Sequence, residues 1–214
     1  MARLKNLLQT KPRAGRASSP TQAVIGLRNP GVDYEGTRHN SGYEVLARVL
    51  ERAGEKLGRA PSRVRAQVTT IGAGDDRVLY AVPMTYMNES GRAVRSLLDY
   101  FDLSPASVLV VHDDIDLPFG RLRLQVGGGS GGNNGVRSIE SALGTKDFNR
   151  LKLGVGRPPG QMDAADFVLR PFTKAERPEV ALMVEDAADV VELWPTDPAR
   201  AQELAALRGR EPRT

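Results

Sequence analysis

The stretch SVLVVHDD, residues 107–114, is the part of this sequence that decides the fold. Its apolar residues follow one another without a polar interruption, which is typical of a strand buried on both faces of a parallel sheet. A second apolar run, AVIGL at 23–27, is bounded by turn residues and predicts another short buried strand. We therefore expect a sheet at the centre of the fold, with polar residues directly after these two strands.

Segments with helical and strand patterns alternate around these two runs. Apolar residues recur at helical spacing in segments that predict helices over 41–53, 89–101, 136–143, 173–194 and 197–207. Further segments are typical of strands, at 64–71, 78–82, 121–126 and 151–155. This alternation predicts a single α/β domain with a mixed, mostly parallel twisted sheet, flanked by helices on both faces.

The 214 residues suit one domain with short tails. We expect the domain to span residues 21–207, between a basic, disordered N-terminal tail over 1–20 and a C-terminal tail over 208–214. The N-terminal tail contains Lys and Arg but no acidic residue. This composition resembles a transit peptide, but prolines and a glycine interrupt an amphipathic helix, and without a secretory signal we expect a cytoplasmic protein.

The composition excludes several classes of site. The chain has no cysteine, so disulfides, thiolate catalysis and cysteine–metal sites are ruled out. No apolar run approaches the roughly 20 residues of a membrane-spanning helix, so no membrane partner is expected.

Positive charge is unevenly distributed along the chain. The formal charge is +4, and residues 1–20 alone contribute +5. Within the domain, basic residues clearly outnumber acidic ones between Arg121 and Arg157, whereas the stretch from Glu176 to Glu192 is acidic. This asymmetry indicates a face suited to a polyanion, although a solvated surface with scattered arginines explains the charge equally well.

The segment NPGVDYEGTRHN, residues 29–40, follows the strand predicted at 23–27 and contains His39, one of 2 histidines. Sites in open α/β sheets form where the strands end, and histidine is the usual general base near neutral pH. Asp113, at the end of another strand, could fix the tautomer of His39 and leave its second ring nitrogen to accept a proton from water. Alternatively, His39 is a surface or capping residue, Asp113 shapes a turn, or His112 is the base, although its place in a buried strand favours a core role.

Other polar groups also follow strand ends. The amides of Asn29 and Asn88 can donate hydrogen bonds to a carbonyl oxygen that gains negative charge, although both residues can equally shape a turn or cap a helix. The loop GGGSGGNNG, residues 127–135, either binds phosphate or is a flexible surface loop, and it lacks the Gly-Lys-Ser/Thr of a Walker loop. The carboxylates of DDID, residues 113–116, are an alternative magnesium site, the weaker hypothesis because no phosphate-handling motif accompanies them.

Five segments together resemble the bacterial-type peptidyl-tRNA hydrolases. They are GLRNPGVDYEGTRHNSG, PMTYMNESGRAV, VHDDIDLPFGRLRL, GGGSGGNNGVRSIESALGTKDFNRLKLGVGRP and FVLRPF, in the order found in that family, and they extend from about Ala23 to Trp194. The resemblance implies an enzyme that cleaves the ester bond between a peptide and the 3′ end of tRNA. The partner is then peptidyl-tRNA, bound through its acceptor stem and 3′ end, and no metal, organic cofactor or obligate protein partner is implied.

The resemblance also assigns roles to individual residues. It implies that His39 is the catalytic base, that Asp113 supports it, and that Asn29 distinguishes blocked from free aminoacyl ends. Asn88 and Asn134 correspond to substrate-binding amides, and two tyrosines, Tyr34 and Tyr86, lie near the bound 3′ end. The basic cluster becomes a set of expected contacts to tRNA phosphates: Arg121, Arg123, Arg137, Arg150 and Lys152.

One segment departs from the family pattern. The family often has HGGHNG where this chain has SGGNNG, so Ser130 and Asn133 replace two histidines. Asn133 can still form hydrogen bonds but cannot change charge near neutral pH. We expect this position to be secondary and the activity to survive the replacement.

The rival hypothesis is a non-catalytic RNA-binding protein on the same scaffold, as in the plant organellar splicing factors of this family. The basic tail and the altered glycine loop are compatible with it. Binding alone needs neither a base nor its orienting carboxylate. The hypothesis of an enzyme is therefore favoured over that of a binding protein, because the chain retains Asn29, His39, Asn88 and Asp113.

Overall fold

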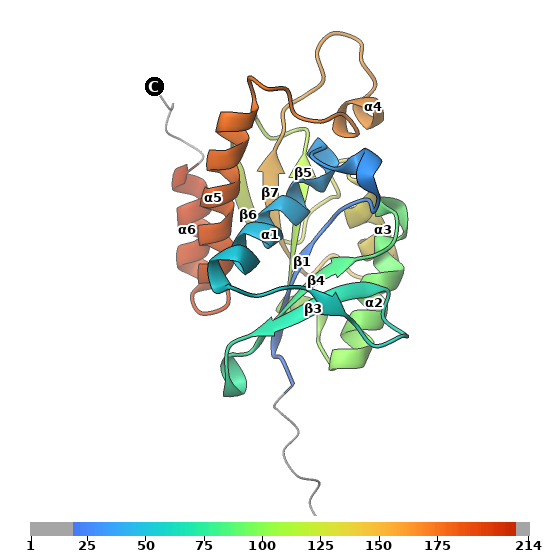
Figure 1. Cartoon of the computed structure of the whole chain (residues 1–214), viewed down its shortest axis with the longest axis vertical. Coiled ribbons are helices and arrows are strands. Elements are labelled where there is room, and N and C mark those ends of the chain that lie inside the picture. Colours follow the sequence, from blue (N-terminus) through green and yellow to red (C-terminus); the bar gives the residue numbers. More distant parts are fainter. Residues whose placement is uncertain (1–18, 209–214) are drawn as a thin grey trace, which may run out of the picture.

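The computed structural model describes residues 19–208, and this part of the chain forms one seven-stranded sheet between helices (Figure 1). The strands are β1 (Gln22–Gly26), β2 (Gly58–Arg59), β3 (Ala66–Ile71), β4 (Val78–Pro83), β5 (Val108–Asp114), β6 (Leu122–Val126) and β7 (Asn149–Gly154). Their order across the sheet is β2-β3-β4-β1-β5-β7-β6. The central strands β4, β1, β5 and β7 are parallel, and antiparallel pairing joins β2, β3 and β6 to their neighbours. The predicted mixed sheet between helices is confirmed, but it is not mostly parallel: within the described residues three strand pairs are parallel and three are antiparallel.

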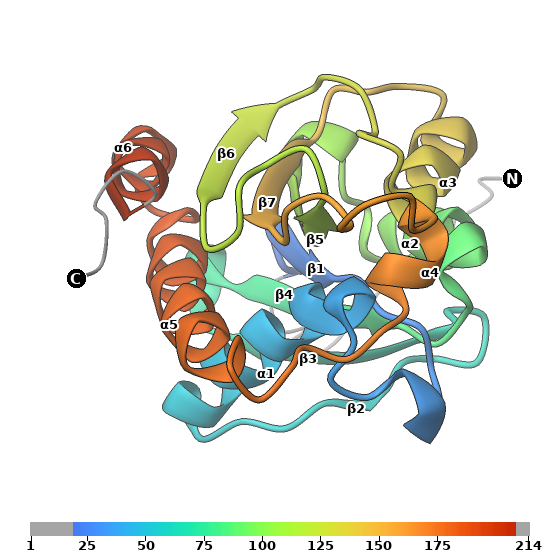
Figure 2. The same ribbon diagram turned by 90° about the horizontal axis from the view of Figure 1, so that it is seen from above.

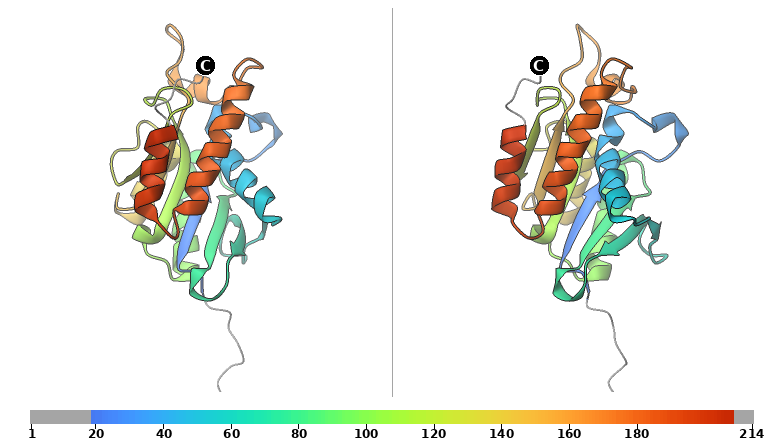
Figure 3. Two further views of the ribbon diagram at one scale, coloured as in Figure 1. Left: turned by 90° about the vertical axis from the view of Figure 1, so that its left-hand side faces the viewer. Right: turned by 60° about the vertical axis from the view of Figure 1, so that its left-hand side comes forward.

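The helices form a layer on each face of the sheet. One face is covered by α1 (Ser41–Ala53), α5 (Arg177–Leu193) and α6 (Pro198–Arg208), and the other by α2 (Ser90–Phe101) and α3 (Asn134–Leu143). Figure 3 shows α5 and α6 side by side along the sheet. Each layer encloses its own core, to which β5 contributes Val111 on one face and Val110 on the other. The short helix α4 (Ala164–Val168) lies beyond the carboxyl ends of the central strands (Figure 2).

The predicted elements agree with the structure except at their ends and in two short pieces. The helix expected over 173–194 begins at Arg177, after a turn at 174–176 that Thr173 and Glu176 close with reciprocal hydrogen bonds. The backbone N–H of Thr173 donates to Glu176 Oε2 at 2.7 Å, and the N–H of Glu176 donates to Thr173 Oγ1 at 3.3 Å. β2 and α4 were not predicted, since elements of 2 and 5 residues give almost no periodic signal.

The tails expected at 1–20 and 208–214 lie almost wholly outside the described residues. The first strand begins at Gln22 and the last helix ends at Arg208, close to the limits expected for the domain. Within residues 19–208, no helix combines the length and the apolar character needed to cross a membrane.

Two glycines bring α1 into direct contact with the centre of the sheet. A Cβ atom on Gly42 would lie 2.2 Å from the carbonyl oxygen of Val111 in β5, and one on Gly26 in β1 would lie 2.7 Å from the carbonyl oxygen of Gly42. Neither position has room for a side chain, so the first turn of α1 rests on the backbone of β1 and β5. The 3-10 turn Arg38–Asn40, which immediately precedes α1, is thereby held beside the end of β5.

Gly42→Ala is expected to destabilise the fold by about 2 kcal/mol or more, because the added methyl group must push α1 away from the backbone of β5. Thermal unfolding measures this loss. Gly58→Ala is the control, since its Cβ atom would meet only the carbonyl oxygen of Val68 at 3.8 Å. A melting temperature lowered no more by Gly42→Ala than by Gly58→Ala would contradict the close packing.

Candidate active site

The carboxyl ends of β1, β4 and β5 meet the N-terminus of α3 at a cleft of about 620 Å³. These strands are parallel neighbours, so the residues that follow them gather at the same edge of the sheet. All the expected catalytic and substrate-binding residues except Tyr34 line the cleft: Asn29, His39, Tyr86, Asn88, Asp113 and Asn134. Tyr34 does not line it but contacts Tyr86 edge to face, with the ring centroids 6.4 Å apart.

His39 and Asp113 form a buried pair in this cleft. Nδ1 of His39 lies 2.9 Å from Oδ1 and 3.0 Å from Oδ2 of Asp113, and the two residues are only 6% and 2% exposed. Burial by itself lowers the pKa of His39, because it disfavours the charged imidazolium. The charge and the hydrogen bond of Asp113 outweigh burial, so the pKa of His39 is raised above its ordinary value of 6.5.

The contact with Asp113 determines what each ring nitrogen of His39 can do. A carboxylate at Nδ1 favours the tautomer that carries its proton there, which leaves a lone pair on Nε2. Among residues 19–208, none is hydrogen-bonded to Nε2, and His39 lines the cleft. Nε2 is therefore the atom that can accept a proton from a molecule bound in the cleft.

His112, the alternative base, is buried in the core. It is 1% exposed, and its Nδ1 lies 2.7 Å from the carbonyl oxygen of Asp113. Burial lowers the pKa of His112 to about 4, and the charge of Asp113 offsets this effect only in part. The side chain is therefore neutral near pH 7 and does not line the cleft, in agreement with the core role that its strand position favoured.

Asp113 has a second partner in Asn133, a residue that the sequence analysis treated as secondary. The side-chain NH2 group of Asn133 donates to Oδ1 of Asp113 at 2.8 Å and to its backbone carbonyl oxygen at 3.2 Å. Oδ1 of Asn133 accepts the N–H groups of Gly135 and Val136 and so caps α3. Asn133 thus ties the carboxylate to the start of a helix. The only sequence signal for this contact is the asparagine in place of a histidine in SGGNNG.

Asn29 is held so that its amide NH2 group faces the cleft. Its Oδ1 accepts the backbone N–H of Met87 at 2.8 Å, which leaves the NH2 end for the cleft that it lines. Asn40, which the sequence analysis missed, accepts the N–H of Asn29 at 2.8 Å and donates to the carbonyl oxygen of Asn29 at 3.1 Å. This reciprocal pair fastens the turn that carries His39 to the end of β1. Its signal in the sequence is an amide directly after the histidine.

The other carboxylates of the DDID segment have separate partners. Oδ2 of Asp114 lies 2.9 Å from Nζ of Lys152, and Asp116 forms an ion pair with Arg157. Across residues 19–208, no group of three or more His, Cys, Asp or Glu side chains is arranged to hold a metal ion. The alternative magnesium hypothesis therefore gains no support from the described part of the chain.

Comparisons with known proteins identify the family of the chain. The family model described as peptidyl-tRNA hydrolase matches residues 23–211. Proteins named peptidyl-tRNA hydrolase from Mycobacterium tuberculosis (strain H37Rv) and Frankia alni are 50% and 49% identical to it. These matches cover 79% and 81% of this chain and 88% and 87% of the relatives. The chain belongs to the peptidyl-tRNA hydrolase family. The crystal structure of peptidyl-tRNA hydrolase from Acinetobacter baumannii is similar, with a TM-score of 0.80 and 29% identity, and the match covers 90% of this chain and 97% of that one.

One phosphate contact expected from the resemblance to peptidyl-tRNA hydrolases, Arg150, is contradicted by its burial. Arg150 is 0% exposed, pairs with Glu140 at 3.0 Å and donates to the carbonyl oxygen of Gly129. Lys152 is also buried and is paired with Asp114. A fully enclosed cation cannot reach a phosphate on the surface, so Arg150 stabilises the sheet and the glycine loop instead, whereas Lys152 lines a small cavity beside the cleft.

Asn133→Asp is expected to raise the pKa of His39 further, because a second carboxylate beside Asp113 also stabilises the imidazolium. The cap of α3 should survive, since aspartate caps helices as well as asparagine does. NMR titration of the 2 histidines measures the shift, with Asn134→Asp as a control that places the same charge on the exposed neighbour. A pKa of His39 that stays unchanged or falls would contradict the contact between Asn133 and the pair.

Proposed function

We propose that this protein hydrolyses the ester bond between peptide and tRNA in peptidyl-tRNA, with His39 as the general base. The observation that carries the proposal is the buried His39–Asp113 pair, whose remaining ring nitrogen meets a cleft lined by side-chain amides. The substrate is supported by relatives at 50% and 49% identity that are named peptidyl-tRNA hydrolases. The chemistry uses side chains of one chain only, and we propose that it takes place in the cytoplasm, where tRNA serves translation.

The proposed reaction begins when Nε2 of His39 removes a proton from water and the resulting hydroxide attacks the ester carbonyl carbon. Asp113 orients the ring and stabilises the imidazolium that forms. The carbonyl oxygen gains negative charge, which the amide groups of Asn29 and Asn88 stabilise by donating hydrogen bonds. The ester bond then breaks, and the ribose oxygen of the tRNA leaves with the proton that His39 returns.

Other residues of the cleft suit the two ends of this substrate. We assign the NH2 group of Asn29 to the peptide side of the ester. There a hydrogen-bond donor would disfavour the ammonium group of a free aminoacyl-tRNA, which is itself a donor. Tyr86 is 56% exposed and packs against Tyr34, and these rings offer surfaces on which the terminal bases can stack. Asn134, in the first turn of α3, adds a further amide beside them.

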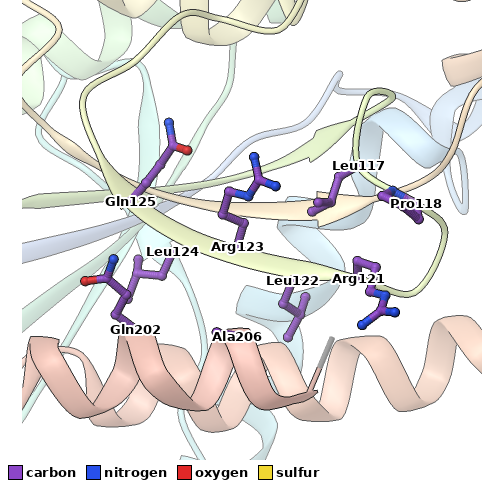
Figure 4. A pocket seen from close by; sticks show the side chains of 9 residues that line it. All are labelled: Leu117, Pro118, Arg121, Leu122, Arg123, Leu124, Gln125, Gln202 and Ala206. Atoms are coloured by element: carbon purple, nitrogen blue, oxygen red, sulfur yellow. The ribbon is translucent and has the colours of Figure 1, made fainter. Parts of the chain in front are cut away.

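A groove near the cleft carries two arginines that suit the phosphates of the acceptor stem. This groove of about 540 Å³ beside β6 and α6 is lined by Arg121, Arg123, Gln125 and Gln202, with no acidic side chain among its lining residues (Figure 4). A cavity of about 300 Å³ shares Arg123 with this groove and Gly131 with the cleft, so the three spaces adjoin one another. Its lining also includes Asp114 and Asp116, which are paired with Lys152 and Arg157.

Three exposed or partly exposed arginines remain as proposed phosphate contacts: Arg121, Arg123 and Arg137. Such contacts recognise the A-form backbone and not its sequence, which suits an enzyme that must accept many tRNAs. The alternative of a non-catalytic RNA-binding protein is not supported by the comparisons. It would also leave the buried base and its carboxylate without a role.

Single-turnover cleavage of an N-blocked aminoacyl-tRNA tests the catalytic base. His39→Ala should lose at least ~100-fold in rate, the usual contribution of a general base. The wild-type rate should rise with pH through a pKa above 6.5, as the imidazole loses its proton. Asp113→Asn should move this rise to lower pH, because burial then lowers the pKa of His39 without an opposing carboxylate.

His112→Gln is the control for these rates, because buried His112 has a pKa of about 4 and should not contribute to the rise near neutral pH. Equal rates for wild type and His39→Ala would exclude the proposed mechanism.

Arg123→Gln should raise KM for different peptidyl-tRNAs by a similar factor, because a lost phosphate contact carries no sequence information. The slope of log KM against log salt should become shallower by about 0.7 to 0.9. Arg200→Gln is the matched control, since Arg200 is an exposed residue of α6 that does not line the groove. The same salt slope in the wild type and both variants would argue against tRNA binding in the groove.

A further inference from the structure

We infer that Arg38 is a positioning residue that fixes the α4 wall of the cleft against the turn that carries His39. The inference rests on the proposed function, because the wall matters only if the cleft binds substrate. Helix α4 and the residue after it contribute Ala164, Val168 and Leu169 to the cleft. This segment lies beyond the ends of the strands and outside both helical layers (Figures 1 and 2). Its apolar side chains Phe167 and Val168 join the hydrophobic core, and polar contacts to Arg38 fix its position further.

The side chain of Arg38 supplies four hydrogen bonds around this segment through its two terminal nitrogens. Nη1 donates to the carbonyl oxygens of Arg170 and Pro171, each at 3.1 Å. Nη2 donates to both carboxylate oxygens of Glu176, at 2.7 and 2.9 Å. One buried guanidinium thus joins the segment that follows α4 to the residue that precedes α5.

Aromatic and backbone contacts extend the same connection. The guanidinium carbon of Arg38 lies 4.2 Å from the ring centroid of Phe167 in α4 and 4.9 Å from that of Phe172. The backbone N–H of Arg38 donates to the carbonyl oxygen of Arg170, and the N–H of Phe172 donates to that of Gly36, each at 3.2 Å. The segment after α4 is therefore fastened along residues 36–38, directly before His39.

These contacts need an arginine and not merely a positive charge. The planar guanidinium directs several N–H groups at fixed angles, so it can serve two carbonyl oxygens and both oxygens of a carboxylate together. A lysine ammonium at the same place can satisfy only part of this set. Arg38 does not line the cleft, and His39 has its own contact with Asp113, so loss of the arginine should move the wall more than the base.

Arg38→Lys tests the inference by separating KM from kcat. We expect KM for an N-blocked aminoacyl-tRNA to rise about tenfold with kcat changed less than about threefold, because the wall contributes to binding and the catalytic pair remains. The pH at which kcat/KM rises should stay as in the wild type. Hydrogen exchange, measured without substrate, should be at least about tenfold faster in residues 163–173 but unchanged in α1.

Arg52→Lys is the matched control, because Arg52 of α1 pairs with three carboxylates of α5, those of Glu185, Asp189 and Glu192, without lining the cleft. Glu176→Gln keeps the arginine and should reproduce the KM effect even if Arg38→Lys fails to fold. The inference is overturned by unchanged exchange in 163–173, by a kcat loss at constant KM, or by an equal KM effect in Arg52→Lys. An inactive wild type would overturn the proposed function alone, because the exchange experiment needs no turnover.

Discussion

The hydrogen bond between Nδ1 of His39 and the carboxylate of Asp113 is the interaction on which the whole site depends. A buried carboxylate is costly unless its oxygens find partners, and here His39 and Asn133 provide them at 2.9 and 2.8 Å. The fold must first bring α1 against the backbone of β5, which only a glycine at position 42 allows. The packing of a helix on the sheet and the chemistry of the base are therefore set by the same contact region.

The buried strands, the edge at which they end and the start of α3 could be predicted from the sequence, because each follows from a local pattern of residues. SVLVVHDD and AVIGL form buried, parallel neighbouring strands, with Gly26 opposite Val111. Because parallel neighbours end at the same edge, the pattern correctly placed His39 and Asp113 near each other, although 74 residues separate them. The glycine-rich loop leading into α3 could be located in the same way, since a helix start has its own sequence signals.

Apart from the His39–Asp113 pair, the partners of individual polar side chains could not be predicted, because tertiary packing decides them. Arg150 and Lys152 alternate with leucines in β7, a pattern that equally fits a strand with one face in solvent. Their pairing with Glu140 and Asp114 depends on where α3 and β5 lie, and no spacing in the sequence reports this. The contact of Asn133 with Asp113 was missed for the same reason: a loop residue has no periodicity that reveals its direction.

The turn Arg38–Asn40 explains how the side chain of His39, outside the strands and long helices, can have an orientation as fixed as that of a residue on a strand. A 3-10 turn has three residues per turn, so its successive side chains leave the axis about 120° apart. Arg38 reaches Glu176, His39 reaches Asp113 and Asn40 reaches Asn29, which belong to three separate parts of the fold. A rotation of the turn that improved one contact would break the other two. The direction of the imidazole is therefore fixed by its neighbours as much as by its own hydrogen bond, because contacts on three sides hold this single 3-10 turn in place.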